Sequence, residues 1–294
     1  MIDSLLTAAA PLLLAALGAL VTDLAGTLGI FIEGFMTLGS FCSWIIAGKT
    51  GSVFWGSLAS GLIMAAAGWA LACFVRRTGA NPFIAALALN LAAGGITGSL
   101  SAAWFGTGGV LRNPGSIVYG PVRIPFIGDL PLLGPVLSGH LPYVYLSWIC
   151  AAAAAVVTGK TTLGLRLRAA GRSPEAALER GIRTGLYREG AWAAAAFLAA
   201  LAGAALTFRV GAYTPGGSAG RGWIALAAVY LGFRTVWGTV AAALLFAAAE
   251  LAGLGIQGLG ALPATVLLGF PPALALGLYA VSSRIGKRQK DGKR

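Results

Sequence analysis

Long apolar runs, separated by short polar breaks, dominate this chain almost from its first residue to about residue 282. A helix needs about twenty mostly apolar residues to cross the hydrocarbon core of a bilayer. A shorter apolar piece, 223–233, is long enough for only about half a crossing at roughly 1.5 Å per residue, which predicts a half-helix covered by protein. The full-length crossings are predicted at residues 4–22, 28–47, 53–75, 82–105, 142–158, 190–208, 236–252 and 262–282.

The composition agrees with a chain that is solvated mainly by lipid. Hydrophobic residues make up 57% of the 294 positions and charged residues 10%, whereas an average soluble domain carries about 25% charged residues. We therefore predict an all-α fold, a polytopic membrane helix bundle of about eight or nine spans including the half-helix, in a single domain over residues 1–294. Aromatic side chains near span ends are expected to anchor it at the membrane interface: Trp104, Trp148, Trp192 and Trp223.

The formal net charge of +12 raises the question of a nucleic-acid partner, because basic patches are the electrostatic footprint of such proteins. The basic residues, however, gather at span ends: at Arg76 and Arg77, in the loop 159–189, and in the tail after residue 283. Counting crossings places these three clusters on one side, which the positive-inside rule makes cytoplasmic. The predicted N-terminus is then outside, the C-terminus cytoplasmic, the loop 106–141 extracytoplasmic, and no nucleic acid is expected.

The chain also repeats itself weakly. The segment from Trp55 to Ala59 resembles the segment from Trp237 to Ala241, at an offset of 182 residues. In the predicted topology the two copies cross in opposite directions, and such an inverted repeat is how many transport folds build a substrate site near the midplane. The alternative is a chance match between two apolar segments.

The loop 159–189 contains the signals of a short helix. Ser173 is a favoured N-cap, Pro174 suits the first helical position, and Glu175 complements the helix dipole in the first turn. The residues Ala176, Ala177 and Leu178 continue this helix toward Gly181. The residue pattern alone leaves two interpretations open: the helix rests on lipid headgroups, or it docks into a partner protein.

Polar residues inside the predicted spans are the candidates for a substrate pathway, because buried ionisable and amide groups in membranes are costly. Glu33 either lines the pathway or receives backbone donors where the helix breaks beside Gly34. Asn90 either faces the pathway or bonds a neighbouring helix. We assign five residues to the candidate pathway. Glu33, Asn90 and Thr97 are polar residues inside predicted spans, Met36 lies on the same span as Glu33, and Ser218 lies in the segment that leads into the half-helix.

Arg221, just before the half-helix, either holds an anion or anchors the entry. The many glycines, 44 in all, and runs such as Ala151–Ala155 and Ala193–Ala196 indicate close helix packing through small residues.

Catalytic chemistry is not indicated. The three cysteines have unrelated spacings, His140 stands alone, and no nucleophile lies beside a base, so we predict no metal, no cofactor and no enzyme activity. Gly159-Lys160-Thr161 ends like a phosphate-binding loop, but that motif needs a glycine where this chain has Ala154. No nucleotide site is expected.

Three stretches, in order, resemble a known family. They are Pro11–Gly18 together with Gly29–Ser40, Gly164–Gly185 followed by the small-residue span Ala191–Leu206, and Ser218–Val229. Together they are similar to the permease subunits of bacterial ATP-binding-cassette (ABC) importers of the simple-sugar and nucleoside type. This is the branched-chain amino acid and ribose-type family, which includes riboflavin-importer relatives.

The resemblance implies a multi-pass subunit of the bacterial cytoplasmic membrane that works by alternating access. It would pair with a second permease subunit, two cytoplasmic ATPase subunits and an extracytoplasmic substrate-binding protein. A heterodimer is favoured over a homodimer, because the chain is short and its outer loop matches the family weakly. The residues implied to couple to the ATPase are Ser173, Pro174, Glu175, Ala176, Ala177, Leu178 and Gly181.

The rival hypothesis is a stand-alone secondary transporter coupled to an ion gradient, since inverted repeats and broken helices occur there too. Such a protein should carry several carboxylates or histidines near the midplane. Among the predicted spans only Glu33 fits that description, which favours the importer.

Overall fold

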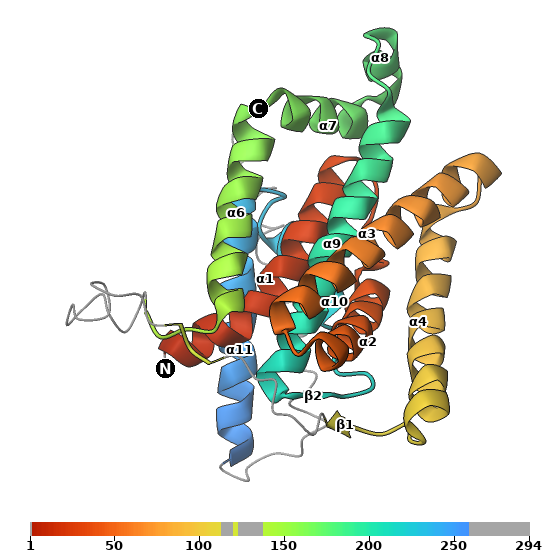
Figure 1. Cartoon of the computed structure of the whole chain (residues 1–294). Helices are drawn as coiled ribbons and strands as arrows, with labels where there is room; N and C mark the ends of the chain where they lie inside the picture. The colour runs from red at the N-terminus through yellow and green to blue at the C-terminus, as the bar shows by residue number, and fades with distance from the viewer. Residues whose placement is uncertain (1, 113–119, 123–137, 259–294) are drawn as a thin grey trace.

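The structure is a computed structural model and describes residues 2–112, 120–122 and 138–258 (Figure 1). The predicted span 262–282 and most of the loop 106–141 lie outside the described residues. The described chain is mainly helical. Its helices are α1 (Ile2–Leu24), α2 (Ile32–Thr50), α3 (Val53–Thr78), α4 (Pro82–Phe105), α6 (Pro142–Lys160), α7 (Thr162–Arg172), α8 (Pro174–Glu179), α9 (Thr184–Val210), α10 (Arg221–Leu231) and α11 (Val236–Gly258).

Six of these helices, α1, α3, α4, α6, α9 and α11, are long and apolar enough to cross a membrane. The predicted polytopic helix bundle is therefore confirmed. α2 was also predicted to cross, and it has 19 residues, but it is not among the six. Glu33 near its start and Lys49 near its end lower its hydropathy.

The bundle has two distinct ends (Figure 1). At one end, which we call the α7–α8 end, α7 and α8 project beyond the long helices. At the other, the β end, α1 begins, and β1 (Leu111–Arg112) pairs antiparallel with β2 (Ala212–Tyr213), Leu111 opposite Tyr213. The sequence pattern did not predict this two-stranded ribbon. It ties the chain after α4 to the chain after α9.

Helix α9 lies at the centre of the core, and its small residues let other helices approach its backbone closely. A Cβ atom added at Gly203 would lie 2.1 Å from the Met36 carbonyl oxygen of α2, and one at Gly39 would lie 2.4 Å from the Ala200 Cα atom. Ala195 and Ala196 are fully buried there. The predicted packing through alanine runs is thus confirmed in part. Several run members, Ala152, Ala153 and Ala194, are exposed instead.

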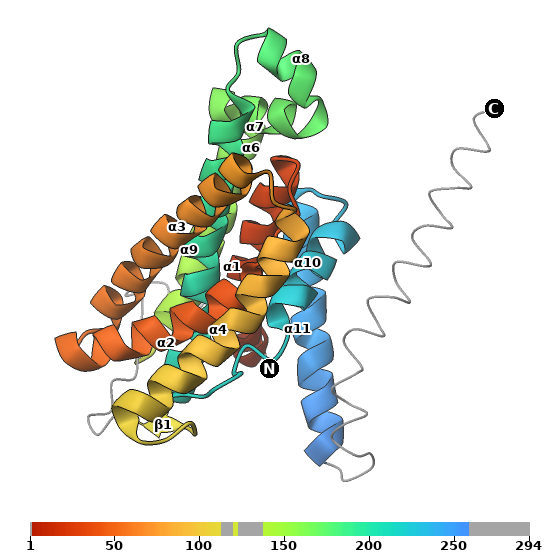
Figure 2. The ribbon, with the colours of Figure 1, turned by 90° about the vertical axis from the view of Figure 1, so that its right-hand side faces the viewer.

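The helices repeat at the same offset of 182 as the sequence. Adding 182 to the bounds of α1 gives 184–206, inside α9, and adding 182 to Val53, where α3 begins, gives 235, beside the start of α11. α1 runs toward the α7–α8 end and α9 runs away from it (Figure 1), while α3 and α11 flank this pair on opposite sides (Figure 2). The fold is an inverted pseudo-repeat.

One part of the repeat is broken. The offset takes α2 onto residues 214–232, but the corresponding helix, α10, begins only at Arg221. The residues that would form its first turns are instead the glycine-rich chain that returns from β2. The predicted half-helix is therefore confirmed as α10. It packs against α2, its counterpart in the repeat, since Gly222 of α10 meets the backbone of Glu33 in α2.

Candidate functional site

The start of α10 is held inside the bundle by an unusual backbone path. Gly220 precedes the helix with φ 79° and ψ 9° and makes no side-chain cap, and Ala219 also has a positive φ of 47°. Glycine tolerates this left-handed conformation at little cost. The first backbone N–H groups of a helix lack partners within the helix, so those of α10 need an acceptor from another element.

Glu33 supplies that acceptor from the first turn of α2. Its Oε1 atom accepts hydrogen bonds from Ser218 Oγ at 2.6 Å and from the Gly220 N–H at 3.0 Å. Its Oε2 atom accepts from the Gly222 N–H at 2.7 Å. Thr37 Oγ1 lies 3.2 Å from Ser218 Oγ and extends the network. The carboxylate therefore caps α10 and complements the positive end of its dipole.

Asn90 of α4 forms hydrogen bonds to the backbone at the start of α2. Its Oδ1 atom accepts from the Gly34 N–H at 2.8 Å, and its Nδ2 atom donates to the Ile30 carbonyl oxygen at 2.9 Å. These bonds fasten α4, at the periphery of the bundle (Figure 1), to the chain that enters α2. Of the two interpretations of Asn90, the bond to a neighbouring helix is the one with observed contacts.

The five pathway candidates do not form one cluster. Glu33 and Ser218 are in direct contact, and Asn90 adjoins them through Gly34, the residue after Glu33. Met36 is fully buried in the core. Thr97 is buried and donates to the Ala93 carbonyl oxygen of its own helix at 2.8 Å. Their role in a pathway stays a prediction.

The region predicted as one short helix in a loop contains two helices. α7 was not predicted. It begins after Thr161, whose Oγ1 accepts from the Gly164 N–H at 3.2 Å. α8 begins at Pro174 as expected, but Ser173 makes no side-chain capping bond. Its backbone carbonyl instead accepts from the Ala177 N–H at 3.0 Å, so the predicted side-chain cap is wrong.

Side chains of α8 face in two directions. Leu178 is 56% exposed and Ala177 only 4% exposed, while Glu175 and Ala176 are also exposed. Gly181, with φ 77°, ends the segment that contains α7 and α8. We call this segment the α7–α8 unit. A partner that binds α8 would therefore meet Glu175, Ala176 and Leu178, and not Ala177.

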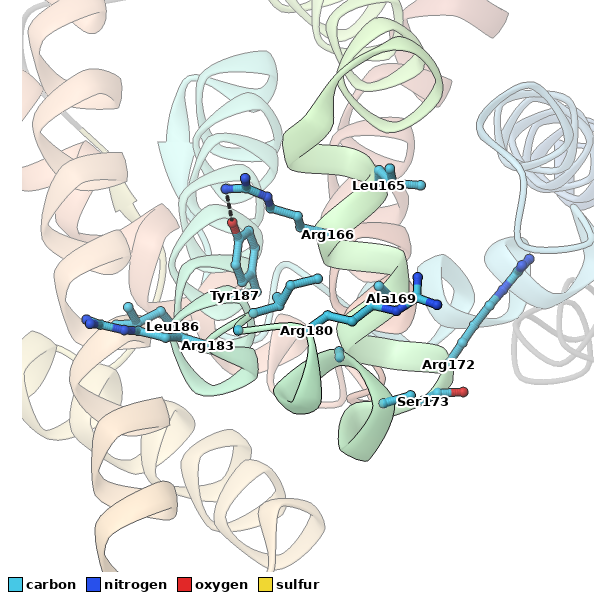
Figure 3. A pocket seen from close by; sticks show the side chains of 13 residues that line it. Leu165, Arg166, Ala169, Arg172, Ser173, Arg180, Arg183, Leu186 and Tyr187 are labelled. Carbon is cyan, nitrogen blue, oxygen red and sulfur yellow. Dashed lines mark hydrogen bonds between the residues drawn. The ribbon is translucent and has the colours of Figure 1, made fainter.

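A cleft of about 800 Å³ separates α7, α8 and the start of α9 (Figure 3). We call it the α7–α8 cleft. Its wall includes four arginines, Arg166, Arg172, Arg180 and Arg183, and Arg166 donates to the Tyr187 hydroxyl at 3.4 Å. Such a wall suits acidic groups of a partner protein.

The α7–α8 unit packs directly on the turn between α1 and α2. A Cβ atom added at Gly171 of α7 would lie 2.2 Å from the Leu24 carbonyl oxygen and 2.8 Å from the Gly26 nitrogen. Arg188 also donates to the Ala25 carbonyl oxygen of this turn at 3.3 Å. Helix α7 is therefore in direct backbone contact with the turn that leads into α2.

Ion pairs between helices were missed by the sequence analysis. Arg76 of α3 pairs with Glu189 of α9, and the Trp69 Nε1 atom donates to Glu189 at 3.1 Å. Glu250 of α11 pairs with Arg221, so the observed contact of Arg221 is an anchoring one. One sequence signal could have identified Glu189. It is a carboxylate close to the end of a span, on the side of the membrane where the basic residues are concentrated.

The third pair joins Asp23, in the last turn of α1, to Arg234, in the turn between α10 and α11. Arg234 Nε lies 2.5 Å from Oδ2 and Nη2 lies 2.9 Å from Oδ1. These hydrogen bonds raise the pKa of the Arg234 guanidinium above its usual value. The pair fixes the turn against α1.

Comparison with known proteins assigns the chain to a family. Residues 1–281 match the model described as the branched-chain amino acid transport system / permease component. The chain belongs to this permease family. No solved structure matches this permease.

Curated relatives support the assignment. The permease is 30% identical over 238 residues to a putative glucose ABC transporter permease protein of Haloferax volcanii, covering 78% of this chain and 69% of the relative. It is 28% identical over 254 residues to a nucleoside ABC transporter permease protein of Lactococcus lactis, covering 83% and 79%. It is 29% identical over 265 residues to a guanosine ABC transporter permease protein of Bacillus subtilis, covering 85% and 80%.

Proposed function

We propose that this chain is the transmembrane permease subunit of an ABC importer that carries a nucleoside, a simple sugar or a nucleoside-like vitamin such as riboflavin. One permease domain over residues 1–294 would move the substrate by alternating access. The observation that supports this most is the α7–α8 unit, which projects from a membrane bundle of this permease family and packs by Gly171 on the turn into α2.

The charge distribution supports an orientation in which the α7–α8 end is cytoplasmic and the N-terminus is outside. Basic residues are far more numerous at the α7–α8 end, and the positive-inside rule makes that side cytoplasmic. The described basic residues there are Arg76, Arg77, Lys160, Arg166, Arg168, Arg172, Arg180, Arg183, Arg188 and Arg234. Those at the β end are Lys49, Arg112 and Arg209.

The substrate proposal rests on the relatives and on the chemistry of the repeat interface. Glucose, nucleoside and guanosine are named for the relatives, and all are neutral near pH 7. In this chain the positive end of α10 is already occupied by the Glu33 carboxylate. A second anion would be repelled there, so a neutral, polar solute fits best.

The partners follow from the same proposal. A second permease subunit, in a heterodimer, would complete the membrane gate, and an extracytoplasmic binding protein would deliver the substrate. Two ATPase subunits would bind the α7–α8 end. ATP-driven closure of these subunits would move α7, and Gly171 would transmit the movement to the turn before α2.

Binding of the ATPase to α8 is tested by substitutions that change the polarity or charge of exposed side chains on this helix. Leu178→Glu is expected to reduce recovery of the ATPase with the tagged permease about tenfold or more, because an unpaired charge buried at an interface costs about 2–5 kcal/mol. Glu175→Lys should also lower recovery, because a positive side chain in the first turn opposes the dipole of α8 and weakens the docking helix. The measurement is the ATPase-to-permease ratio after purification from membranes.

The matched control is Arg209→Glu, which reverses a charge at the exposed end of α9 on the β side. It should leave the ratio unchanged. Equal ATPase recovery from Leu178→Glu, Glu175→Lys and the unmodified chain would show that α8 is not the docking element. Ala177 is unsuitable for this test because it is buried, so its substitution disturbs the fold of the unit.

A further inference from the structure

A second cleft, of about 630 Å³, lies at the α7–α8 end but on another side of α7 from most of the α7–α8 cleft. We call it the arginine cleft. The ends of α1 and α6, one side of α7 and the turn between α10 and α11 enclose it. Three guanidinium groups line it, Arg168, Arg172 and Arg234, against one lining carboxylate, Asp23. The difference, three minus one, leaves two positive charges in the wall.

Asp23 does not neutralise all three arginines. Its two oxygens are bound by Arg234 at 2.5 and 2.9 Å, and the Tyr230 hydroxyl donates to Oδ1 at 3.3 Å. Arg168 donates from Nε to the Gly164 carbonyl oxygen at 3.4 Å, which leaves its two terminal nitrogens for other acceptors. Arg172 is exposed, and in Figure 3 it extends away from Tyr187, toward the turn between α10 and α11.

The backbone adds a further attraction for an anion. Helix α11 begins at Val236, which is part of the cleft wall, so the positive end of its dipole lies beside the three arginines. Phe233 and Arg234 have φ values of 54° and 58°, a conformation that residues other than glycine rarely adopt. This turn directs Arg234 to Asp23 and brings the start of α11 into the wall.

The surroundings of the arginine cleft are apolar. Phe233 in its wall is 72% exposed, and Trp237, the next residue after Val236, is 62% exposed. Val157, beside Thr158 and Gly159 of the wall, is 37% exposed. Aromatic residues of this kind are typical of the membrane–water interface. The cleft therefore offers cationic donors inside and apolar contacts at its edge.

We propose that the arginine cleft binds a phosphate group, supplied either by the headgroup of an anionic phospholipid or by free phosphate. Guanidinium groups match phosphate oxygens through paired hydrogen bonds, and basic pockets between transmembrane helices are known forms of headgroup site. A bound phosphate would bridge α7 and the turn before α11, and so join the α7–α8 unit to the second half of the repeat. This proposal rests on the membrane fold and not on the transported substrate.

The test uses the full-length chain in detergent, titrated with phosphatidylglycerol in one arm and with inorganic phosphate in the other, and observed by native mass spectrometry. The Arg168→Gln/Arg172→Gln double variant is expected to bind phosphatidylglycerol roughly 25-fold more weakly, about fivefold for each arginine. Arg77→Gln is the control, because Arg77 is an exposed arginine at the same end outside the cleft.

The outcomes separate the two sources. Saturable binding of phosphatidylglycerol that inorganic phosphate does not displace, weakened in the double variant and intact in Arg77→Gln, supports the lipid headgroup. Binding of inorganic phosphate alone, with the same dependence on Arg168 and Arg172, supports free phosphate. Equal binding by the unmodified chain, the double variant and the control in both arms would overturn the proposal. Circular dichroism of each variant verifies its helical fold.

Discussion

Replacement of Glu33 by Ala is expected to abolish uptake and to lower the free energy of unfolding by about 3 kcal/mol. The substitution removes the acceptor of Ser218 and of two backbone N–H groups at the start of α10. Buried donors without partners cost about 1–3 kcal/mol each, and partial relaxation reduces the sum. With about 2–4 °C per kcal/mol for a chain of this size, the melting temperature should fall by roughly 6–12 °C.

The measurement for Glu33→Ala is thermal unfolding in detergent, followed by uptake in the assembled transporter. Glu179→Ala is the control, since Glu179 is an exposed carboxylate at the end of α8 and should change the melting temperature by about 1 °C or less. Glu33→Gln keeps one carbonyl acceptor and should fall between the two. If Glu33→Ala unfolds at the same temperature as Glu179→Ala, the capping role of Glu33 is wrong.

The second large effect is expected at the contact between α2 and α9. In Gly203→Ala the added methyl group would meet the Met36 carbonyl oxygen at 2.1 Å and the Ser40 nitrogen at 2.9 Å. Both are backbone atoms, so the helices must separate, and overpacking of this kind costs about 1–3 kcal/mol. Because Glu33 lies on α2, uptake should fall together with stability.

Gly190→Ala provides a control in the same helix. A Cβ atom added at Gly190 meets nothing within 4 Å, so alanine there should stabilise α9 by up to about 1 kcal/mol through helix propensity. Opposite shifts of the melting temperature for the two glycine variants are predicted. Two shifts of the same sign and size would mean that the close approach of α2 and α9 does not govern stability.

Much of the helical fold could be predicted because each long span carries its own signal. Apolar length alone located the helices that became α3, α4, α6 and α11, and the short run that became α10 was placed within two residues of its start at Arg221. The repeat offset of 182 also anticipated the relation between α3 and α11. These features depend on local composition and on direct comparison of two segments.

Other features depend on partners far away in the chain, which no local pattern reveals. The strands β1 and β2 have two residues each, too few for a recognisable alternation. α7 was read as loop because Arg166, Arg168 and Arg172 interrupt its apolar positions. Only the structure shows which face of α7 packs against the bundle, because Leu167 and Ala170 are buried there.

Trp192 shows how an error in a helix boundary changes the role of a residue. The predicted span began at residue 190, which made Trp192 an expected interface anchor. α9 instead begins at Thr184, so Trp192 lies two turns inside the helix. It is 3% exposed, packs on Phe31 and donates to Thr27 Oγ1 at 3.0 Å. The anchoring role predicted for it is wrong.

The candidate site was anticipated in its residues but not in its geometry. Glu33 and Asn90 were singled out because polar groups in apolar spans are costly, and Ser218 because it lies in the segment that leads into the half-helix. The sequence could not show that Glu33 caps α10 rather than its own helix, because Glu33 and Gly222 are 189 residues apart. That contact makes the start of α10 depend on α2, and it links the two halves of the inverted repeat.

The central claim is that this chain forms the membrane gate of an ATP-driven importer. The most direct test is to purify the tagged chain with its bound partners, to reconstitute the complex in liposomes, and to measure uptake of a labelled nucleoside with and without ATP. We predict that an ATPase is recovered with the chain and that uptake requires ATP hydrolysis. Uptake by the chain alone, driven by an ion gradient and independent of ATP, would contradict the account.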